Sequence, residues 1–249
     1  MVIKWVQHHS PTQSPSHKST AGNGFAPNLN LSGAVVFRAF CFKNNAAESL
    51  GIKLLAQGRD PLVEVPFVTA LDKSPLSGQL SEQDAVLAVN DVAAVGATPT
   101  TAIMKKTSGQ LEVLALRGVE LDAVRHLIVR KGSATQKFGI VLSGPRDGGY
   151  APVVIKLESN SPLAQQEGIC SPNRDGLQVG DVVLTVNGQL ALHPEHTTEL
   201  LINAPVGDVV LTYVKRDSRA NQSGTIVNGQ GFVRLHPDLL GDSGTEGRI

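Results

Sequence analysis

The chain has 249 residues, of which 41% are hydrophobic and only 4% aromatic, and its 22 basic side chains balance its 22 acidic ones. This length suits one large domain or two small ones, with cores built mainly from Val, Leu, Ile and Ala. The neutral balance, without a basic stripe, argues against nucleic acid or an anionic membrane as the main partner. No apolar run is long enough to predict a membrane span, and no secretory signal is visible. Cys41 and Cys170 form no disulfide framework or metal spacing, so we expect free thiols in a cytoplasmic protein.

The first half of the chain reads as a tail followed by a small, mainly β domain. Residues 1–33 are rich in Ser, Pro, Thr, His and Asn without periodicity, which predicts a disordered N-terminal tail. Hydrophobic patterning then runs over residues 34–118. It predicts strands at 34–42, 50–55, 63–68, 84–91 and 111–116. Ser74-Pro75-Leu76 predicts the start of a short helix, and residues 99–107 predict a longer one.

The same order of elements recurs after a short linker at residues 119–124. Over residues 125–217 we predict strands at 126–129, 138–142, 152–157, 180–188 and 208–214, with a short helix from Ser161 and a longer one at 196–203. Residues 218–249 are predicted to be a flexible C-terminal tail, in which 225–235 form either a hairpin or no fixed structure.

The spacing of matched residues indicates an internal duplication. Gly51 and Gly139 are 88 residues apart, whereas Asn90 and Asn187 are 97 apart, as are Val113 and Val210. One insertion, a loop around residues 167–175, accounts for the change of spacing. The linker between the copies reaches about 15 Å as a flexible chain, so we expect the two domains to be close neighbours.

The run from Lys137 to Leu142 is the candidate binding element. Phe138, Ile140 and Leu142 share one face of the predicted strand. Gly139 allows a sharp turn that leaves backbone N–H groups pointing outward and unpaired. Free N–H groups beside apolar side chains suit the C-terminal carboxylate of a peptide with a hydrophobic last residue.

Residues 125–217 resemble a PDZ domain, a peptide-binding module. The resemblance lies in Phe138-Gly139-Ile140, preceded by the basic residues Arg130, Lys131 and Lys137, in the run Gly180–Gly188, and in His196, nine residues after Asn187. It implies two tandem α+β, mainly β domains, each a partly open β-barrel with one long and one short helix, the first copy being divergent. It also implies a loop whose backbone N–H groups hold the carboxylate with a basic side chain assisting. By the same resemblance His196 hydrogen-bonds a Ser or Thr hydroxyl two residues before the end of the peptide.

The resemblance assigns peptide-contacting positions in both copies. In the second copy these are Lys137, Phe138, Gly139, Ile140, Val141, Leu142, His196 and Leu200. In the first copy they are Leu50, Gly51, Ile52, Leu54 and Ile103, with Lys43 as the basic residue upstream. Both copies depart from the family at the helix wall, where Lys106 and Asn203 replace an apolar residue, and Pro99 stands in place of the histidine in the first copy. In the second copy either Leu201 or Ile202 completes this wall, or the pocket is partly polar.

The resemblance implies a non-catalytic scaffold or adaptor that binds the C-terminal tails of other proteins, such as membrane receptors or transporters, and reaches the membrane through them. We expect no cofactor, no metal, no nucleic acid and no direct membrane insertion. No Gly-x-Ser-x-Gly nucleophile elbow is present, and no enzymatic activity is predicted. Two alternatives stay open: a structural or oligomerising tandem module with degenerate grooves, including a homodimer, and a regulatory accessory of a protease complex.

Overall fold

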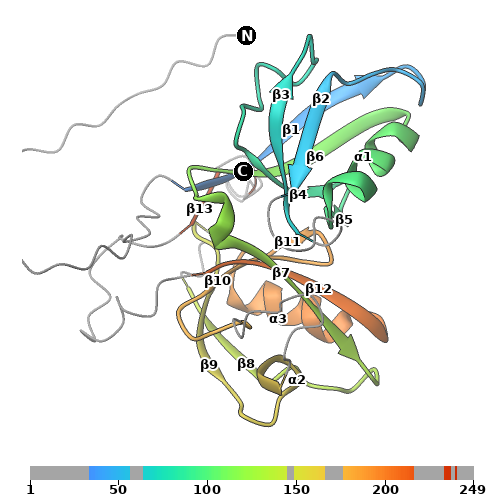
Figure 1. Cartoon of the computed structure of the whole chain (residues 1–249). Coiled ribbons are helices and arrows are strands. Elements are labelled where there is room, and N and C mark those ends of the chain that lie inside the picture. The colour runs from blue at the N-terminus through green and yellow to red at the C-terminus, as the bar shows by residue number, and fades with distance from the viewer. Residues whose placement is uncertain are drawn as a thin grey trace, which may run out of the picture.

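The computed structural model describes residues 34–56, 64–144, 149–165, 176–215, 233–236 and 239. These residues form two sheets that lie one above the other in Figure 1, each with its own long helix. No helix within these ranges is long and apolar enough to cross a membrane.

The first sheet contains the strands of the N-terminal copy. Its elements are β1 (Val35–Lys43), β2 (Ile52–Ala56), β3 (Pro66–Leu71), β4 (Ala85–Val89), β5 (Val92–Ala93), α1 (Ala97–Lys106) and β6 (Gly109–Arg117). The strand order is β13-β1-β6-β4-β3-β2, with β5 paired to β4, so β2 lies at one edge. Every residue of β4 is buried, as its continuous apolar run predicts for a central strand.

The second sheet repeats this arrangement. Its elements are β7 (Val124–Lys131), β8 (Ile140–Ser143), β9 (Val153–Leu157), α2 (Pro162–Gln165), β10 (Val182–Val186), β11 (Gln189–Leu190), α3 (Pro194–Asn203) and β12 (Gly207–Val214). The strand order is β7-β12-β10-β9-β8, so β8 lies at the edge as β2 does. A short 3₁₀ helix, η2 (Leu121–Ala123), occupies the linker. Over the described residues neither sheet closes into a barrel. The predicted order of strands along the chain is confirmed in both copies.

Two details of the predicted duplication were wrong. The short helix predicted at Ser74 is a hydrogen-bonded turn, in which the Leu76 amide donates to Ser74 Oγ at 3.2 Å and the Leu80 amide to Leu76 O at 2.8 Å. The predicted match of Val113 with Val210 is also wrong. Val113 pairs with Val89 in the first sheet, whereas Leu211 takes the equivalent place opposite Val186. The turn between α3 and β12 is therefore one residue longer than its counterpart.

A hydrophobic cluster joins the two sheets, which confirms that the domains are close neighbours. It contains the equivalent pairs Leu87 and Leu184, Ala85 and Val182, and Val36 and Val124. All six side chains are at most 3% exposed. Each copy thus presents the same face to the other, as identical subunits do across a two-fold interface.

A segment from the expected C-terminal tail lies between the two sheets. Within it, β13 (Arg234–Leu235) runs parallel to β1. The amides of Arg234 and His236 donate to Ala34 O and Val36 O, and on the other side the Ala151 amide donates to Val233 O at 3.0 Å. Val233 and Leu235 are at most 1% exposed. This part of residues 218–249 is therefore packed, while residues 225–232 lie outside the described ranges.

Candidate functional site

Strand β8 offers a free edge to an additional strand. It pairs with β9 on one side, and within the described ranges no strand lies on the other. Ile140 and Leu142 pack against the core of the second domain, whereas Val141 is 40% exposed on the opposite face. In the first domain β2 has the same arrangement, with Ile52 and Leu54 packed inward.

The glycine before each edge strand has a conformation and surroundings that only glycine tolerates. Gly139 has a φ of 64°, and a Cβ at this position would lie 2.2 Å from Ser161 Cβ. Gly51 has a φ of 60°, and its Cβ would lie 1.9 Å from Asp72 O. The Gly139 carbonyl accepts from the Glu158 amide at 2.8 Å, and the Gly51 carbonyl from the Asp72 amide at 2.7 Å. Both turns are thus anchored through their carbonyl groups.

The backbone N–H groups at the second turn are available. Among the described residues no hydrogen bond reaches the amide of Phe138 or Gly139. In the first copy the Gly51 amide makes one long contact, 3.3 Å, to Ser49 Oγ. Unpaired N–H groups in a left-handed turn form an anion-binding concavity, which is the feature that the sequence predicted for a carboxylate.

The apolar side chains predicted for the second groove come together. Phe138 is 4% exposed and belongs to the core of the domain, and Ile140, Leu142 and Leu200 pack at its margin. Lys137 is exposed in the loop before them. In the first copy Leu50 is buried, and Ile52, Leu54 and Ile103 are each partly buried against the core of that domain.

Of the two residues of α3 that the sequence analysis considered for the helix wall, Leu201 is the one that faces the interior. Leu201 is 3% exposed and packs in the core, whereas Ile202 is 63% exposed. Asn203 is the last residue of α3 and lies exposed, as Lys106 does at the end of α1. The equivalent of Leu201 is Met104, which is buried and which the sequence analysis missed. The sequence feature that could have identified Met104 is its spacing of 97 residues from Leu201, which equals the spacing of Asn90 from Asn187.

The first copy contains a pocket beside the turn at Gly51. It has a volume of about 240 Å³ and lies between the loop before β2 and the inner face of α1. Its lining residues are Lys43, Ala46, Ala47, Glu48, Ser49, Leu50, Gly51, Ile52, Thr101, Met104 and Lys105.

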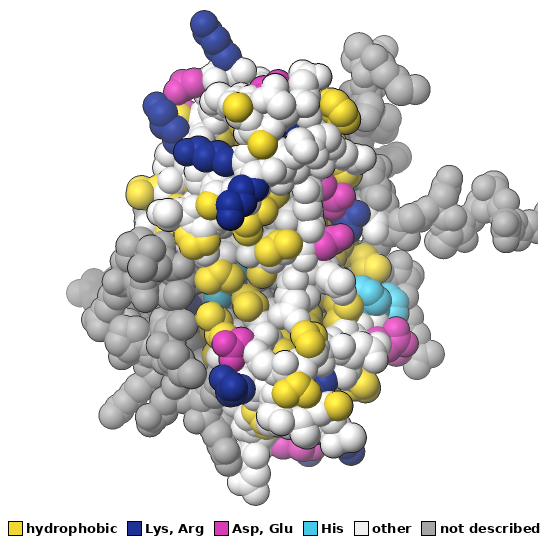
Figure 2. All heavy atoms as spheres, turned by 90° about the vertical axis from the view of Figure 1, so that its right-hand side faces the viewer, with side chains coloured by type: hydrophobic (Ala, Val, Ile, Leu, Met, Phe, Trp, Pro, Cys, Tyr) yellow, Lys and Arg dark blue, Asp and Glu magenta, His cyan; other side chains and the backbone are white. Residues whose placement is uncertain are grey.

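Figure 2 shows Lys and Arg side chains gathered over the upper part of the molecule, with hydrophobic side chains across the middle of the same face.

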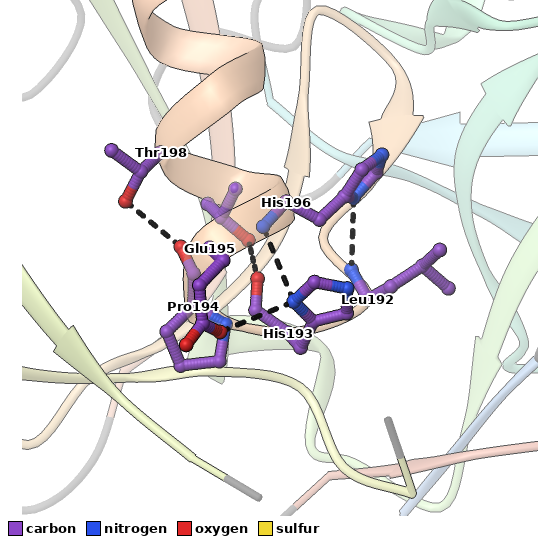
Figure 3. Close-up of polar contacts among 7 residues, drawn as sticks. Leu192, His193, Pro194, Glu195, His196 and Thr198 are labelled. Atoms are coloured by element: carbon purple, nitrogen blue, oxygen red, sulfur yellow. Dashed lines mark hydrogen bonds and ion pairs between the residues drawn. The ribbon is translucent and has the colours of Figure 1, made fainter. Parts of the chain in front are cut away.

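His196 lies in the first turn of α3 within a small polar network (Figure 3). The His193 ring caps the helix by accepting from the His196 amide at 3.2 Å, and Nδ1 of His196 lies 3.5 Å from the Leu192 amide. Burial and the nearby His193 lower the pKa of His196 below its ordinary 6.5, so the ring is neutral at neutral pH. With Nδ1 facing an N–H donor, the proton is on Nε2, which can donate to a hydroxyl group.

The basic residues expected to assist the carboxylate are placed differently. Lys43 and Lys131 are both 1% exposed, and their ammonium groups donate to backbone carbonyls at the ends of the helices. The exposed basic side chain in the second loop is Lys137.

No family model and no curated protein matches the chain. Among solved structures, the PDZ domain from choanoflagellate GIPC bound to GAIP peptide is 16% identical, with a TM-score of 0.31, over 38% of this chain and 92% of that one. INAD PDZ3 in complex with a TRP channel tail is 21% identical, with a TM-score of 0.28, over 38% and 88%. INAD PDZ45 in complex with NG2 peptide is 14% identical, with a TM-score of 0.26, over 80% and 96%. All three are PDZ domains, the family that the sequence resembles.

Proposed function

We propose that this chain is a non-catalytic adaptor that captures the C-terminal tails of partner proteins as an added strand on β8. The observation that supports this most directly is the edge of β8, which no other described strand covers and which begins beside the amides of Phe138 and Gly139, to which no described residue hydrogen-bonds. Main-chain pairing provides affinity that is independent of sequence, and the side-chain pockets provide selectivity. A micromolar dissociation constant, ordinary for such a peptide, corresponds to about −8 kcal/mol.

Selectivity in the second groove is proposed to come from two features. Phe138, Ile140, Leu142 and Leu200 form an apolar margin that suits a hydrophobic last residue. Neutral His196, with its proton on Nε2, suits a Ser or Thr hydroxyl two residues earlier. A tail with both features is the predicted ligand of this groove.

The first groove is proposed to hold only the end of a tail. Its pocket of about 240 Å³ accommodates one terminal side chain. Pro99 occupies the position of His196, so this groove has no hydroxyl donor or acceptor there.

The experiment is a titration of the full chain with peptides of free C-terminus. The full chain is needed because one face of the second domain is covered by the first. Peptides that end in a hydrophobic residue with Ser or Thr two before it should bind, and amidation of the terminus should weaken them at least tenfold. His196→Ala should remove the preference for Ser or Thr over Ala at that position. Ile202→Ala, which alters an exposed side chain of the same helix, is the matched control. Equal binding of amidated and free peptides would contradict the proposal.

The shared core favours a second candidate, a structural module that binds no tails. The cluster between the sheets buries equivalent faces of the two copies, and Lys106 and Asn203 stand at the polar ends of both groove helices. On this account the chain binds no member of a free-terminus peptide library, and its mass in light scattering rises with concentration.

A further inference from the structure

Each copy contains a buried lysine at the end of its first strand. Lys131 Nζ donates to the carbonyl oxygens of Leu201, Ile202 and Ala204 at 3.2, 2.6 and 2.8 Å. Both Lys131 and its equivalent Lys43 are 1% exposed, although lysine is almost never fully buried without partners.

Lys43 Nζ donates hydrogen bonds both to the end of α1 and to the loop before β2. It lies 2.8 Å from Met104 O and 3.4 Å from Lys105 O at the end of α1, and 3.3 Å from Ala46 O in the loop before β2. An ammonium group has three N–H donors, and each lysine has three carbonyl acceptors. Neither lysine keeps a donor for the carboxylate of a ligand.

The carbonyl groups that accept from these lysines indicate their structural role. The last carbonyls of a helix have no partner within it, and a cation there satisfies them and interacts favourably with the helix dipole. Each lysine also opposes a glycine of positive φ, Gly109 for Lys43 and Gly207 for Lys131. Lys131 Nζ lies 6.0 Å from the centre of the Phe138 ring, so the lysine sits beneath the apolar end of the groove.

We propose that Lys43 and Lys131 are positioning residues that fix the distance between the end of the groove helix and the carboxylate loop. This inference rests on the proposed function, because it assigns a role to residues of the same grooves. The two lysines make this connection in different ways. Lys43 donates to carbonyls of both α1 and the loop itself. Lys131 is the last residue of β7, directly before the loop, and has all its acceptors at the end of α3.

The test is Lys131→Met in the full chain, measured with a peptide that ends in Ser-x-Val as free acid and as amide. Methionine keeps the apolar stem and removes the ammonium group. Because the lysine positions the wall and does not touch the carboxylate, both peptides should lose affinity by the same factor, about tenfold. Lys156→Met, at an exposed lysine of β9 to which no peptide contact is assigned, is the control. It should change the affinity for either peptide less than threefold.

Two results would overturn the inference. A loss confined to the free acid would make Lys131 a direct carboxylate ligand, and an unchanged affinity for both peptides would show that the helix end is held without it. If Lys131→Met does not fold, Lys131→Gln replaces it, and Lys43→Met tests the same role in the first copy against exposed Lys53→Met.

A separate measurement distinguishes failure of the inference from failure of the proposed function. If the unaltered chain binds neither peptide, the function fails, and hydrogen exchange of the free protein still tests the lysine. Lys131→Met should then speed exchange of the amides at 200–204 at least tenfold, with no change in Lys156→Met. Equal exchange in the two variants would refute the positioning role.

Discussion

Nε2 of His126 lies 2.9 Å from the carbonyl oxygen of Ala94, and this hydrogen bond connects the two sheets. On the other side of the ring, Nδ1 lies 3.0 Å from Thr212 Oγ1, which accepts from the Thr185 hydroxyl at 2.9 Å. A carbonyl only accepts, so Nε2 carries the proton and Nδ1 accepts from Thr212. Burial lowers the pKa of His126 to about 4, and the hydrogen bond to Ala94 O, which favours the charged ring, offsets only part of this shift.

This arrangement predicts a loss of stability in mild acid. The unfolded chain takes up a proton at His126 near pH 6.5, whereas the folded chain does so only near pH 4. The stabilisation is complete above pH 6.5 and is lost as the pH falls toward 4, by about 3 kcal/mol in the free energy of unfolding. Urea unfolding at a series of pH values measures it.

The control for this prediction is His126→Gln, which keeps an amide donor and acceptor but does not titrate. His196, whose pKa is also lowered, is present in both proteins and cancels in the comparison. The difference in unfolding free energy between the two proteins should shrink as the pH falls from 6.5 to 4. A difference that is independent of pH would show that His126 does not titrate as described.

Gly188→Ala is predicted to damage the contact between the domains. A Cβ on Gly188, whose φ is 86°, would lie 2.5 Å from the Ala93 amide nitrogen and 2.7 Å from Asp91 O. Gly109→Ala is the matched control, since Gly109 has a φ of 85° and nothing within 4 Å of its Cβ position. We expect about 1–2 kcal/mol of destabilisation from backbone strain in the control and clearly more in Gly188→Ala. If thermal unfolding shows that the two variants lose the same stability, the turn at Gly188 and the turn at Asp91–Ala93 can move apart without cost, which would contradict the prediction.

Leu235→Ala is predicted to destabilise both domains together. Leu235 is 1% exposed within the cluster that joins the sheets, and removal of such a side chain costs about 2–5 kcal/mol. Scanning calorimetry should show one transition that shifts to lower temperature as a whole. Ile202→Ala, at an exposed position, should shift it little. Two transitions, only one of them displaced, would show that the domains unfold independently.

The local features of the fold could be predicted from the sequence because they recur. Gly51 and Gly139 lie at equivalent turns with equal backbone geometry, and Asn90 and Asn187 each hold the turn after a buried strand. These features depend on residues close in sequence. Because the same sequence pattern occurs in both copies, each copy supports the structural interpretation of the other.

The relationships between distant segments could not be predicted. The run Val209-Val210-Leu211 is apolar throughout, so a shift of one residue leaves the pattern unchanged. The pairing of β13 with β1 depends on a short run that has the same composition as many exposed tails. Lys43 and Lys131 were identified as basic residues near the grooves, but only the folded chain places their ammonium groups beneath the helix ends.

The central claim is that the backbone amides of Phe138 and Gly139 bind the C-terminal carboxylate of a peptide. Backbone amide chemical shifts of the full chain test this claim most directly. Without peptide these two amides should exchange with solvent rapidly. On addition of a free-terminus peptide they should shift most, together with Ile140, and the shifts should be absent with the amidated peptide. If the two amides are already protected before any peptide is added, or stay unmoved while a tail binds, the account is contradicted.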